Sequence, residues 1–186
     1  MRITILCGSP RKGGNTETLA MALMEGARGA GAEVTLYTLR GKKIGPCVDC
    51  DYCYTHDSCA IPDDMAEVYA LLQNTDALVF ATPVYFYTMS AQLKAVLDRL
   101  HNPVRATFPI RLTALLGVCA DDPQRAFDPM RATFAAIEDY LGWQRVGEVT
   151  VNSVEKIGDM LGNDGVAKAK ALGEKLARTP LPQGKR

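Results

Sequence analysis

The sequence predicts a single α/β domain, in which helices cover both faces of a five-stranded parallel sheet. Three observations support this fold class. Short apolar runs alternate with segments of helical periodicity along the chain, as expected for successive β-α-β units. The apolar runs are continuous, which is typical of strands buried on both faces. The chain has 186 residues, of which 47% are hydrophobic and 23% charged, and these values fit one globular domain.

The first two predicted strands flank a helix. Residues 3–7 form a β-rich run that ends at Gly8, and residues 34–39 form the next apolar run. Between them, residues 15–29 repeat apolar positions at helical spacing. This order predicts a β-α-β unit whose strands pair in parallel through a right-handed crossover.

A long segment without periodicity, residues 40–62, separates this unit from the next helix. It contains four of the six cysteines, and we interpret it as a cysteine-rich insertion lobe. Residues 63–74 carry apolar side chains at positions i, i+3, i+4 and i+7, the pattern of an amphipathic helix. The apolar run at residues 77–82 predicts the third strand.

The second half of the chain continues the alternation. Residues 88–101 predict a helix with one apolar stripe, and residues 112–119 predict the fourth strand. The next helix runs to about Leu141, and Asp128-Pro129 near its start fits an N-cap followed by proline at the first helical position.

The last predicted elements are a strand at residues 146–154 and a helix that begins near Asn163 and ends before Pro180. The predicted domain therefore spans residues 1–178. The remaining residues, 179–186, form a tail with two prolines, which we expect to be frayed.

The charge balance excludes some classes of partner. The chain carries 21 basic and 21 acidic residues, so no broad basic field is available to attract nucleic acid or an anionic membrane. No apolar stretch approaches the ~18 residues that span a bilayer, and residues 1–7 are too short for the core of a signal peptide. We therefore expect a cytoplasmic protein, in which cysteines are more commonly metal ligands or catalytic groups than disulfides.

Residues 8–16 connect the first strand to the first helix and have the composition of an anion-binding loop. Such a junction presents free backbone N–H groups and the positive end of the helix dipole. Ser9 and Thr16 add hydroxyl groups, and Arg11 adds a fixed positive charge. We predict that a phosphate binds here.

Two nucleotide-binding motifs do not fit this loop. A P-loop would need Gly-Lys-Ser/Thr at positions 13–15, whereas the chain has Gly13-Gly14-Asn15. The dinucleotide fingerprint G-x-G-x-x-G fails because Pro10 occupies the second glycine position. Gly26, Gly29 and Gly31 lie at a helix end, so they do not form such a loop either. A plain glycine-rich turn stays open as the alternative.

Four cysteines are grouped in the insertion lobe: Cys47, Cys50, Cys53 and Cys59, with the spacing C-x2-C-x2-C-x5-C. Iron–sulfur clusters use thiolate ligands at such compact spacing, whereas zinc ribbons usually separate two C-x2-C pairs by a longer loop. A loop of about twenty residues without secondary structure is uncommon unless it is functional or disordered. Three interpretations stay open: an iron–sulfur cluster, which we favour, free or redox-paired thiols, and zinc.

The other cysteines and the histidines receive no catalytic role. Cys7 and Cys119 lie at the ends of predicted strands and are interpreted as buried small apolar residues. His56 lies within the lobe and His101 at a helix end, and we expect both to face solvent. We assign no catalytic side chain.

Several motifs follow one another over most of the chain. They are Gly8-Ser9-Pro10-Arg11 with Gly14-Asn15-Thr16, the spaced cysteines, Pro62-Asp63-Asp64-Met65, and residues 81–90 (ATPVYFYTMS) with Lys94 and Leu97-Asp98-Arg99. This set resembles the NADPH-dependent FMN reductase and iron–sulfur flavoprotein family.

The resemblance implies a flavodoxin-like fold, strand order 2-1-3-4-5, with FMN at the switch point between the first and third strands. Four residues of the first loop would hold the FMN phosphate: Ser9, Arg11, Asn15 and Thr16. The backbone of four residues after the third strand would line the isoalloxazine ring: Pro83, Val84, Tyr85 and Phe86. For each aromatic residue at positions 85–87, ordinary core or dimer packing stays an alternative.

The resemblance further implies that electrons pass from NAD(P)H through FMN to a quinone, a flavin, a metal centre or a small redox partner. The four spaced cysteines would hold a 4Fe–4S cluster beside FMN. A homodimer is also implied, with Phe86 and Tyr87 near its surface. Two other classes stay open: a non-enzymatic electron-transfer flavoprotein that serves a protein partner, and a binding module that kept the FMN site. The neutral charge favours the enzyme, because flavodoxin-type carriers are often strongly acidic.

Overall fold

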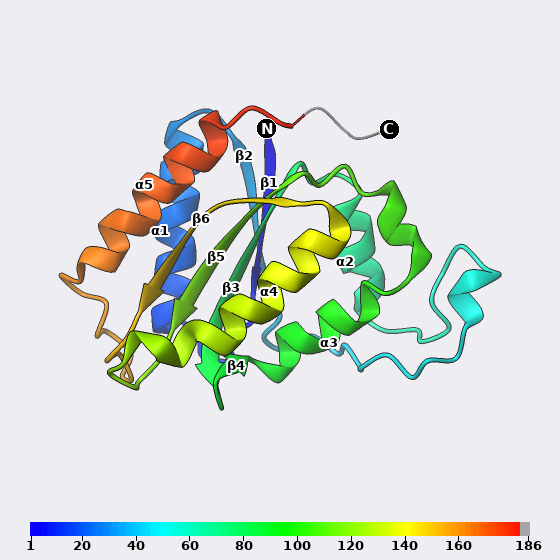
Figure 1. Cartoon of the computed structure of the whole chain (residues 1–186), viewed down its shortest axis with the longest axis horizontal. Helices are drawn as coiled ribbons and strands as arrows, with labels where there is room; N and C mark the ends of the chain where they lie inside the picture. The colour runs from blue at the N-terminus through cyan, green and yellow to red at the C-terminus, as the bar shows by residue number, and fades with distance from the viewer. Residues whose placement is uncertain (183–186) are drawn as a thin grey trace.

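The computed structural model describes residues 1–182, so the end of the predicted tail, residues 183–186, lies outside the described part. Five parallel strands form the sheet in the order β2-β1-β3-β5-β6 (Figure 1). They are β1 (Arg2–Cys7), β2 (Glu33–Thr38), β3 (Ala77–Tyr85), β5 (Leu112–Val118) and β6 (Gln144–Val151). The predicted fourth and fifth strands correspond to β5 and β6, so the predicted fold class and strand order are confirmed.

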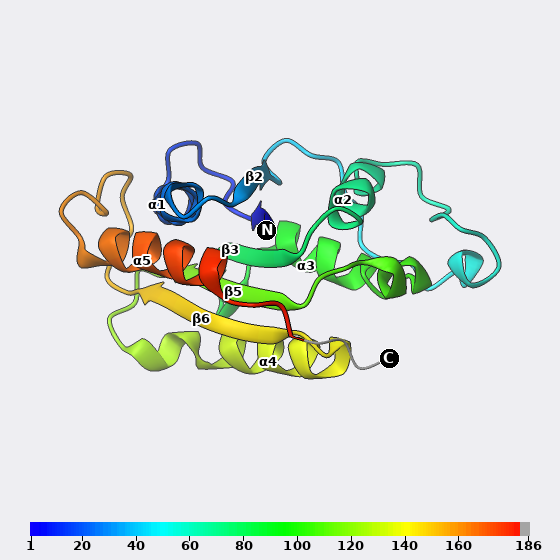
Figure 2. The same cartoon turned by 90° about the horizontal axis from the view of Figure 1, so that it is seen from above.

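The helices form a layer on each face of the sheet (Figure 2). One face is covered by α1 (Asn15–Gly29) and α5 (Asp164–Arg178). The other is covered by α2 (Met65–Leu72), α3 (Ala91–Arg99) and α4 (Asp128–Leu141). Within residues 1–182, no helix is long and apolar enough to cross a membrane.

Alternating strand positions supply the two halves of the core, because successive side chains of a strand point to opposite faces. Ile3 and Ile5 pack under α1 and α5. Leu78 and Phe80 pack under α2, α3 and α4, where the Phe80 ring lies 4.7 Å from that of Phe134. Burial on both faces explains why the strands read as continuous apolar runs.

The helix predicted over residues 88–101 is wrong at its start. Thr88–Met89 form a short strand, β4, which pairs antiparallel with the end of β3. Phe86 and Tyr87 make the reversal with φ values of 51° and 69°. Ser90 has extended backbone and its hydroxyl accepts a 3.4 Å hydrogen bond from Leu93 N–H, so it starts α3 one residue later.

Two further helix starts differ from the predictions. Asp128 is the first residue of α4 and not its N-cap, because a 3-10 turn, η3 (Gln124–Phe127), leads directly into the helix. The second helix begins at Met65 and not at Asp63. The Asp63 carboxylate accepts hydrogen bonds from the N–H groups of Gly45 and Met65, so it fixes the entry of the chain into α2.

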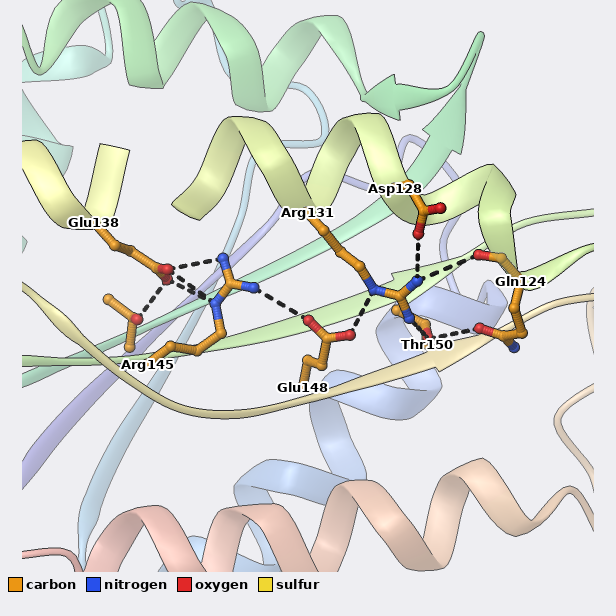
Figure 3. Close-up of polar contacts among 8 residues, drawn as sticks. Gln124, Asp128, Arg131, Glu138, Arg145, Glu148 and Thr150 are labelled. Carbon is orange, nitrogen blue, oxygen red and sulfur yellow. Dashed lines mark hydrogen bonds and ion pairs between the residues drawn. The ribbon is translucent and has the colours of Figure 1, made fainter. Parts of the chain in front are cut away.

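Charged side chains of alternating sign join α4 to β6 (Figure 3). Glu138, only 5% exposed, accepts hydrogen bonds from Arg145 Nε at 2.9 and 3.1 Å, and Arg145 also contacts Glu148 at 3.1 Å. Arg131 extends this network of ion pairs. Its Nε atom lies 2.6 Å from a carboxylate oxygen of Glu148, and its Nη1 atom lies 3.1 Å from one of Asp128. Glu138 also accepts from the Thr113 hydroxyl, near the start of β5, at 2.6 Å. Because a buried carboxylate is costly unless it is paired, this network fixes α4 against β6 and the start of β5.

Candidate functional site

A hollow lies at the carboxyl ends of β3 and β5, beside the loop that follows β1. We call it the strand-end hollow. Seven of the eight residues predicted to contact FMN line it: Ser9, Arg11, Asn15, Thr16, Pro83, Val84 and Tyr85. The eighth, Phe86, lies outside the lining at the tip of the β3–β4 hairpin and is 98% exposed. The hollow therefore assembles residues of two segments that are about seventy positions apart in the chain.

Polar residues of the loop after β1 line one wall of the strand-end hollow. No side chain caps the N-terminus of α1 at Gly14, so the first N–H groups of the helix have no partner within it. Ser9, Asn15 and Thr16 are 5%, 8% and 2% exposed, which places polar groups in a protected position at the positive end of the helix dipole. Glu17 accepts from Gly13 N–H at 2.6 Å and fixes the loop.

The segment after β6 packs against the loop that follows β1. Arg11 donates to the carbonyl of Glu155 at 2.7 Å, and Asn15 donates to that of Lys156 at 3.0 Å. Asp159 accepts from the N–H groups of both Glu155 and Lys156, and these hydrogen bonds lower the pKa of its carboxyl below the usual value. The segment after β6 is thereby fixed beside the loop.

These donors fit a phosphate ester. The loop supplies uncapped helix amides, the hydroxyl groups of Ser9 and Thr16, and one guanidinium, and further N–H groups of Arg11 remain for an anion. The buried Oδ1 atom of Asn15 has no hydrogen-bond partner within residues 1–182, so a donor group of a ligand, such as a hydroxyl, can satisfy it. Pro83 and Val84 border the same hollow with apolar surface, as required by a flat ring.

The cysteine-rich lobe, coloured cyan in Figure 1, extends beyond α2 and α3. All four spaced cysteines line one hollow, together with Tyr69, Arg99 and Asn102. We call it the cysteine hollow. All four are free thiols, with Cys47 and Cys50 exposed and Cys53 and Cys59 partly buried. In the described chain, no three Cys, His, Asp or Glu side chains converge closely enough to form a metal site.

The four thiols are nevertheless near neighbours. Burial raises the pKa of the Cys53 thiol, and charge on Cys59, Cys47 or Cys50 raises it further. As a donor set, four cysteine sulfurs around one hollow fit a cluster of iron and sulfide, provided that the lobe contracts around it.

A buried ion pair closes the base of the lobe. Arg99 at the end of α3 donates to both oxygens of Asp63, at 2.9 and 3.2 Å, and to the carbonyl of Gly45 at 3.1 Å. Asp63 in turn accepts from Gly45 N–H at 2.9 Å. Burial alone would raise the pKa of Asp63, but hydrogen bonds from Arg99, Gly45 and Met65 lower it below its usual value. Gly45 and Asp63 bracket the cysteines, so this contact joins the two ends of the lobe.

The expected environments of the other cysteines and of the histidines are confirmed. Cys7 and Cys119 are buried, at 1% and 6% exposure. His56 is exposed and stacks on Tyr52, with ring centroids 3.8 Å apart. His101 is exposed as well.

Comparison with known proteins identifies the family. Residues 1–161 match the NADPH-dependent FMN reductase family. The chain belongs to this family. An iron-sulfur flavoprotein of Archaeoglobus fulgidus is 45% identical over 103 residues, which are 55% of this chain and 52% of that protein. This match therefore spans about half the length of the relative.

Two further similarities extend over nearly the whole FMN reductase domain. A second iron-sulfur flavoprotein of Archaeoglobus fulgidus is 29% identical over 182 residues, 95% of this chain and 79% of that protein. The solved structure of an NAD(P)H:quinone oxidoreductase from Methanothermobacter marburgensis superposes with a TM-score of 0.79 at 18% identity, covering 97% of this chain and 98% of that one. At this identity the superposition shows a shared fold.

Several residues of the strand-end hollow in this FMN reductase family member are not predicted from sequence. Val118, Cys119 and Ala120 come from the end of β5, and Val154 and Glu155 follow β6. Their positions at or directly after the ends of predicted strands could have identified them, because the carboxyl ends of neighbouring parallel strands meet at one edge of the sheet. Cys119 is thus both a buried residue, as predicted, and a wall of the hollow.

Proposed function

We propose that the protein is an FMN-dependent oxidoreductase that takes electrons from NAD(P)H and passes them to a quinone, a flavin, a metal centre or a small redox partner. The observation that carries this proposal is the strand-end hollow. It combines an uncapped helix N-terminus with an apolar wall from β3, at the position where doubly wound folds of this strand order bind a flavin nucleotide.

Each part of the hollow has a role in this proposal. The backbone of the loop after β1 would bind the phosphate and set the depth of the cofactor, together with four residues of this loop: Ser9, Arg11, Asn15 and Thr16. Pro83, Val84 and Tyr85 would support the ring. Bound FMN would supply the redox chemistry, accepting a hydride from the nicotinamide and releasing electrons to the acceptor. Tyr85 is 46% exposed, which leaves this side of the hollow open to substrates.

We further propose that Cys47, Cys50, Cys53 and Cys59 hold a 4Fe–4S cluster. Their common hollow supports this, and relatives of the chain are named iron-sulfur flavoproteins. Such a cluster would transfer single electrons. The ion pair of Arg99 with Asp63 would keep the lobe attached to α3 while the cysteines close around the cluster.

A homodimer is also proposed. The tip of the β3–β4 hairpin presents Phe86 and Tyr87, which are 98% and 53% exposed. Both take positive φ values, a conformation that non-glycine residues seldom adopt without a function. Large aromatic residues held out in this way support an interface beside the strand-end hollow.

The identity and the reactivity of the flavin test the main proposal. Protein purified without oxygen should release FMN on heating, as identified by chromatography, because the loop suits one terminal phosphate. Addition of NADH or NADPH to the intact protein should then bleach the visible flavin absorbance. Bound FAD, or no flavin after incubation with FMN, would contradict the site. Bound FMN that neither nicotinamide reduces would instead favour an electron carrier.

Replacing Arg11 tests the phosphate loop. Arg11→Ala should weaken FMN binding by about 1.5–3 kcal/mol, roughly a 10- to 150-fold rise in Kd, because a charge-assisted hydrogen bond to phosphate is lost. Lys12→Ala is the matched control, since it removes the same charge from a neighbouring residue that does not line the hollow. Calorimetric titration of the apoproteins measures both. If both variants weaken FMN binding equally, Arg11 contributes only its positive charge and makes no specific hydrogen bond to the phosphate.

A further inference from the structure

Two buried N–H donors that belong to residues lining the cysteine hollow have no hydrogen-bond partner within residues 1–182. They are the Nε atom of Arg99 and the Nδ2 atom of Asn102, whose residues are 2% and 6% exposed. Both residues line the hollow that the four cysteines share. Buried donors in folded proteins are nearly always satisfied, so two such donors at one place indicate a missing acceptor.

The rest of each side chain is fully engaged, which fixes both donors in place. The terminal nitrogens of Arg99 bind Asp63 and the Gly45 carbonyl. The Oδ1 atom of Asn102 accepts from Val104 N–H at 3.0 Å and caps the 3-10 helix η2 (Pro103–Thr107). The Tyr69 hydroxyl donates to the Arg99 carbonyl at 2.7 Å. Its oxygen is the nearby acceptor for the Asn102 amide. Burial raises the pKa of Tyr69 and this contact partly offsets the rise, but the pair does not reach normal hydrogen-bond geometry, which leaves Nδ2 available to a better acceptor.

Sulfur is the acceptor that this hollow offers. Four thiols line it, and cluster-bound thiolates and sulfides accept hydrogen bonds from N–H groups. We propose that Arg99 and Asn102 donate N–H···S hydrogen bonds to the sulfur atoms of an iron–sulfur cluster, and that these bonds raise its reduction potential. The inference rests on the proposed function of the four cysteines as cluster ligands.

Electrostatics give the direction of the effect. A cluster with thiolate ligands gains negative charge when it accepts an electron, and N–H donors stabilise the more negative form more strongly. Asp63, 2.9 Å from the Arg99 guanidinium, balances part of its positive charge. The cluster would therefore be stabilised by the remaining charge and by the Nε–H hydrogen bond together. Loss of either donor should therefore shift the midpoint potential to a more negative value.

Asn102→Ser provides the cleanest variant. Serine is a good N-cap, so it preserves the start of η2 while it removes the Nδ2–H donor. Asn163→Ser is the matched control, because Asn163 caps α5 and does not line the cysteine hollow. Arg99→Lys is the second test, since lysine keeps the charge and removes the planar Nε–H.

Iron and sulfide content and the midpoint potential, from a redox titration followed by electron paramagnetic resonance, should be measured in anaerobically reconstituted proteins. We expect Asn102→Ser to retain the cluster with a more negative potential, and Asn163→Ser to match the wild type. A cluster of unchanged potential in Asn102→Ser would overturn this inference and leave the cluster in place. Wild type without iron or sulfide would overturn the cluster itself. If Arg99→Lys does not fold, Asn102→Ser still decides the question.

Discussion

Gly26→Ala is expected to lower the free energy of unfolding by about 3 kcal/mol or more. A Cβ atom on Gly26 would lie 2.0 Å from the carbonyl oxygen of Lys170 and 2.8 Å from its carbonyl carbon. Both are backbone atoms of α5, so no rotamer change can relieve the overlap. The helices α1 and α5 would have to separate, and the core between them would lose packing density.

The facing helix, α5, also requires a glycine at its contact with α1. A Cβ on Gly173 of α5 would lie 2.1 Å from the carbonyl oxygen of Leu23, so one glycine from each helix allows the two backbones to touch. Gly29→Ala is the control, because within residues 1–182 no atom outside its chain neighbours and its own helix backbone lies within 4 Å of the added Cβ, and alanine favours a helix by up to about 1 kcal/mol. Urea denaturation followed by circular dichroism measures both variants. A Gly26→Ala protein as stable as Gly29→Ala would show that α1 and α5 pack less closely than described.

Helical periodicity and continuous apolar runs predict most of the fold. The first helix begins and ends at the predicted residues, Asn15 and Gly29, because the glycine-rich loop after β1 precedes it and Ala30-Gly31 follows. The hairpin at Phe86 and Tyr87 could not be predicted in this way. Its turn depends on positive φ at two aromatic residues, which no turn preference indicates.

Some residues of the candidate site could be predicted from sequence and others could not. The loop after β1 is contiguous in sequence, and its residue types together indicate an anion. Cys119 and Glu155 enter the same hollow from distant segments, and neither has a chemical signature of its own. Arg99 lies in the segment Leu97-Asp98-Arg99, which resembles the family, but sequence alone cannot show that Arg99 is buried or that it pairs with Asp63. Tertiary contacts of this kind depend on the packing of α3 against the lobe.

Cys50→Ala is expected to abolish binding of the proposed iron–sulfur cluster. Cys50 is the middle of the three closely spaced cysteines, and a 4Fe–4S cluster that loses one thiolate from the centre of its loop is held by too few ligands. Iron and sulfide should disappear together. FMN should stay bound, because the cysteine hollow and the strand-end hollow share no lining residue.

The variant also separates the two electron-transfer steps. Reduction of the flavin by NAD(P)H should continue, whereas transfer to a one-electron acceptor should slow, since the cluster would provide the one-electron path. Cys7→Ala is the control, because Cys7 is a buried thiol, 1% exposed, that lines neither hollow. Iron, sulfide and FMN per chain, together with flavin reduction and acceptor turnover, should be measured in anaerobic preparations of the wild type and both variants. Iron retained at wild-type levels in Cys50→Ala would remove Cys50 from the ligand set, and a wild type that binds FMN but no iron would leave the four cysteines as a thiol-rich lobe.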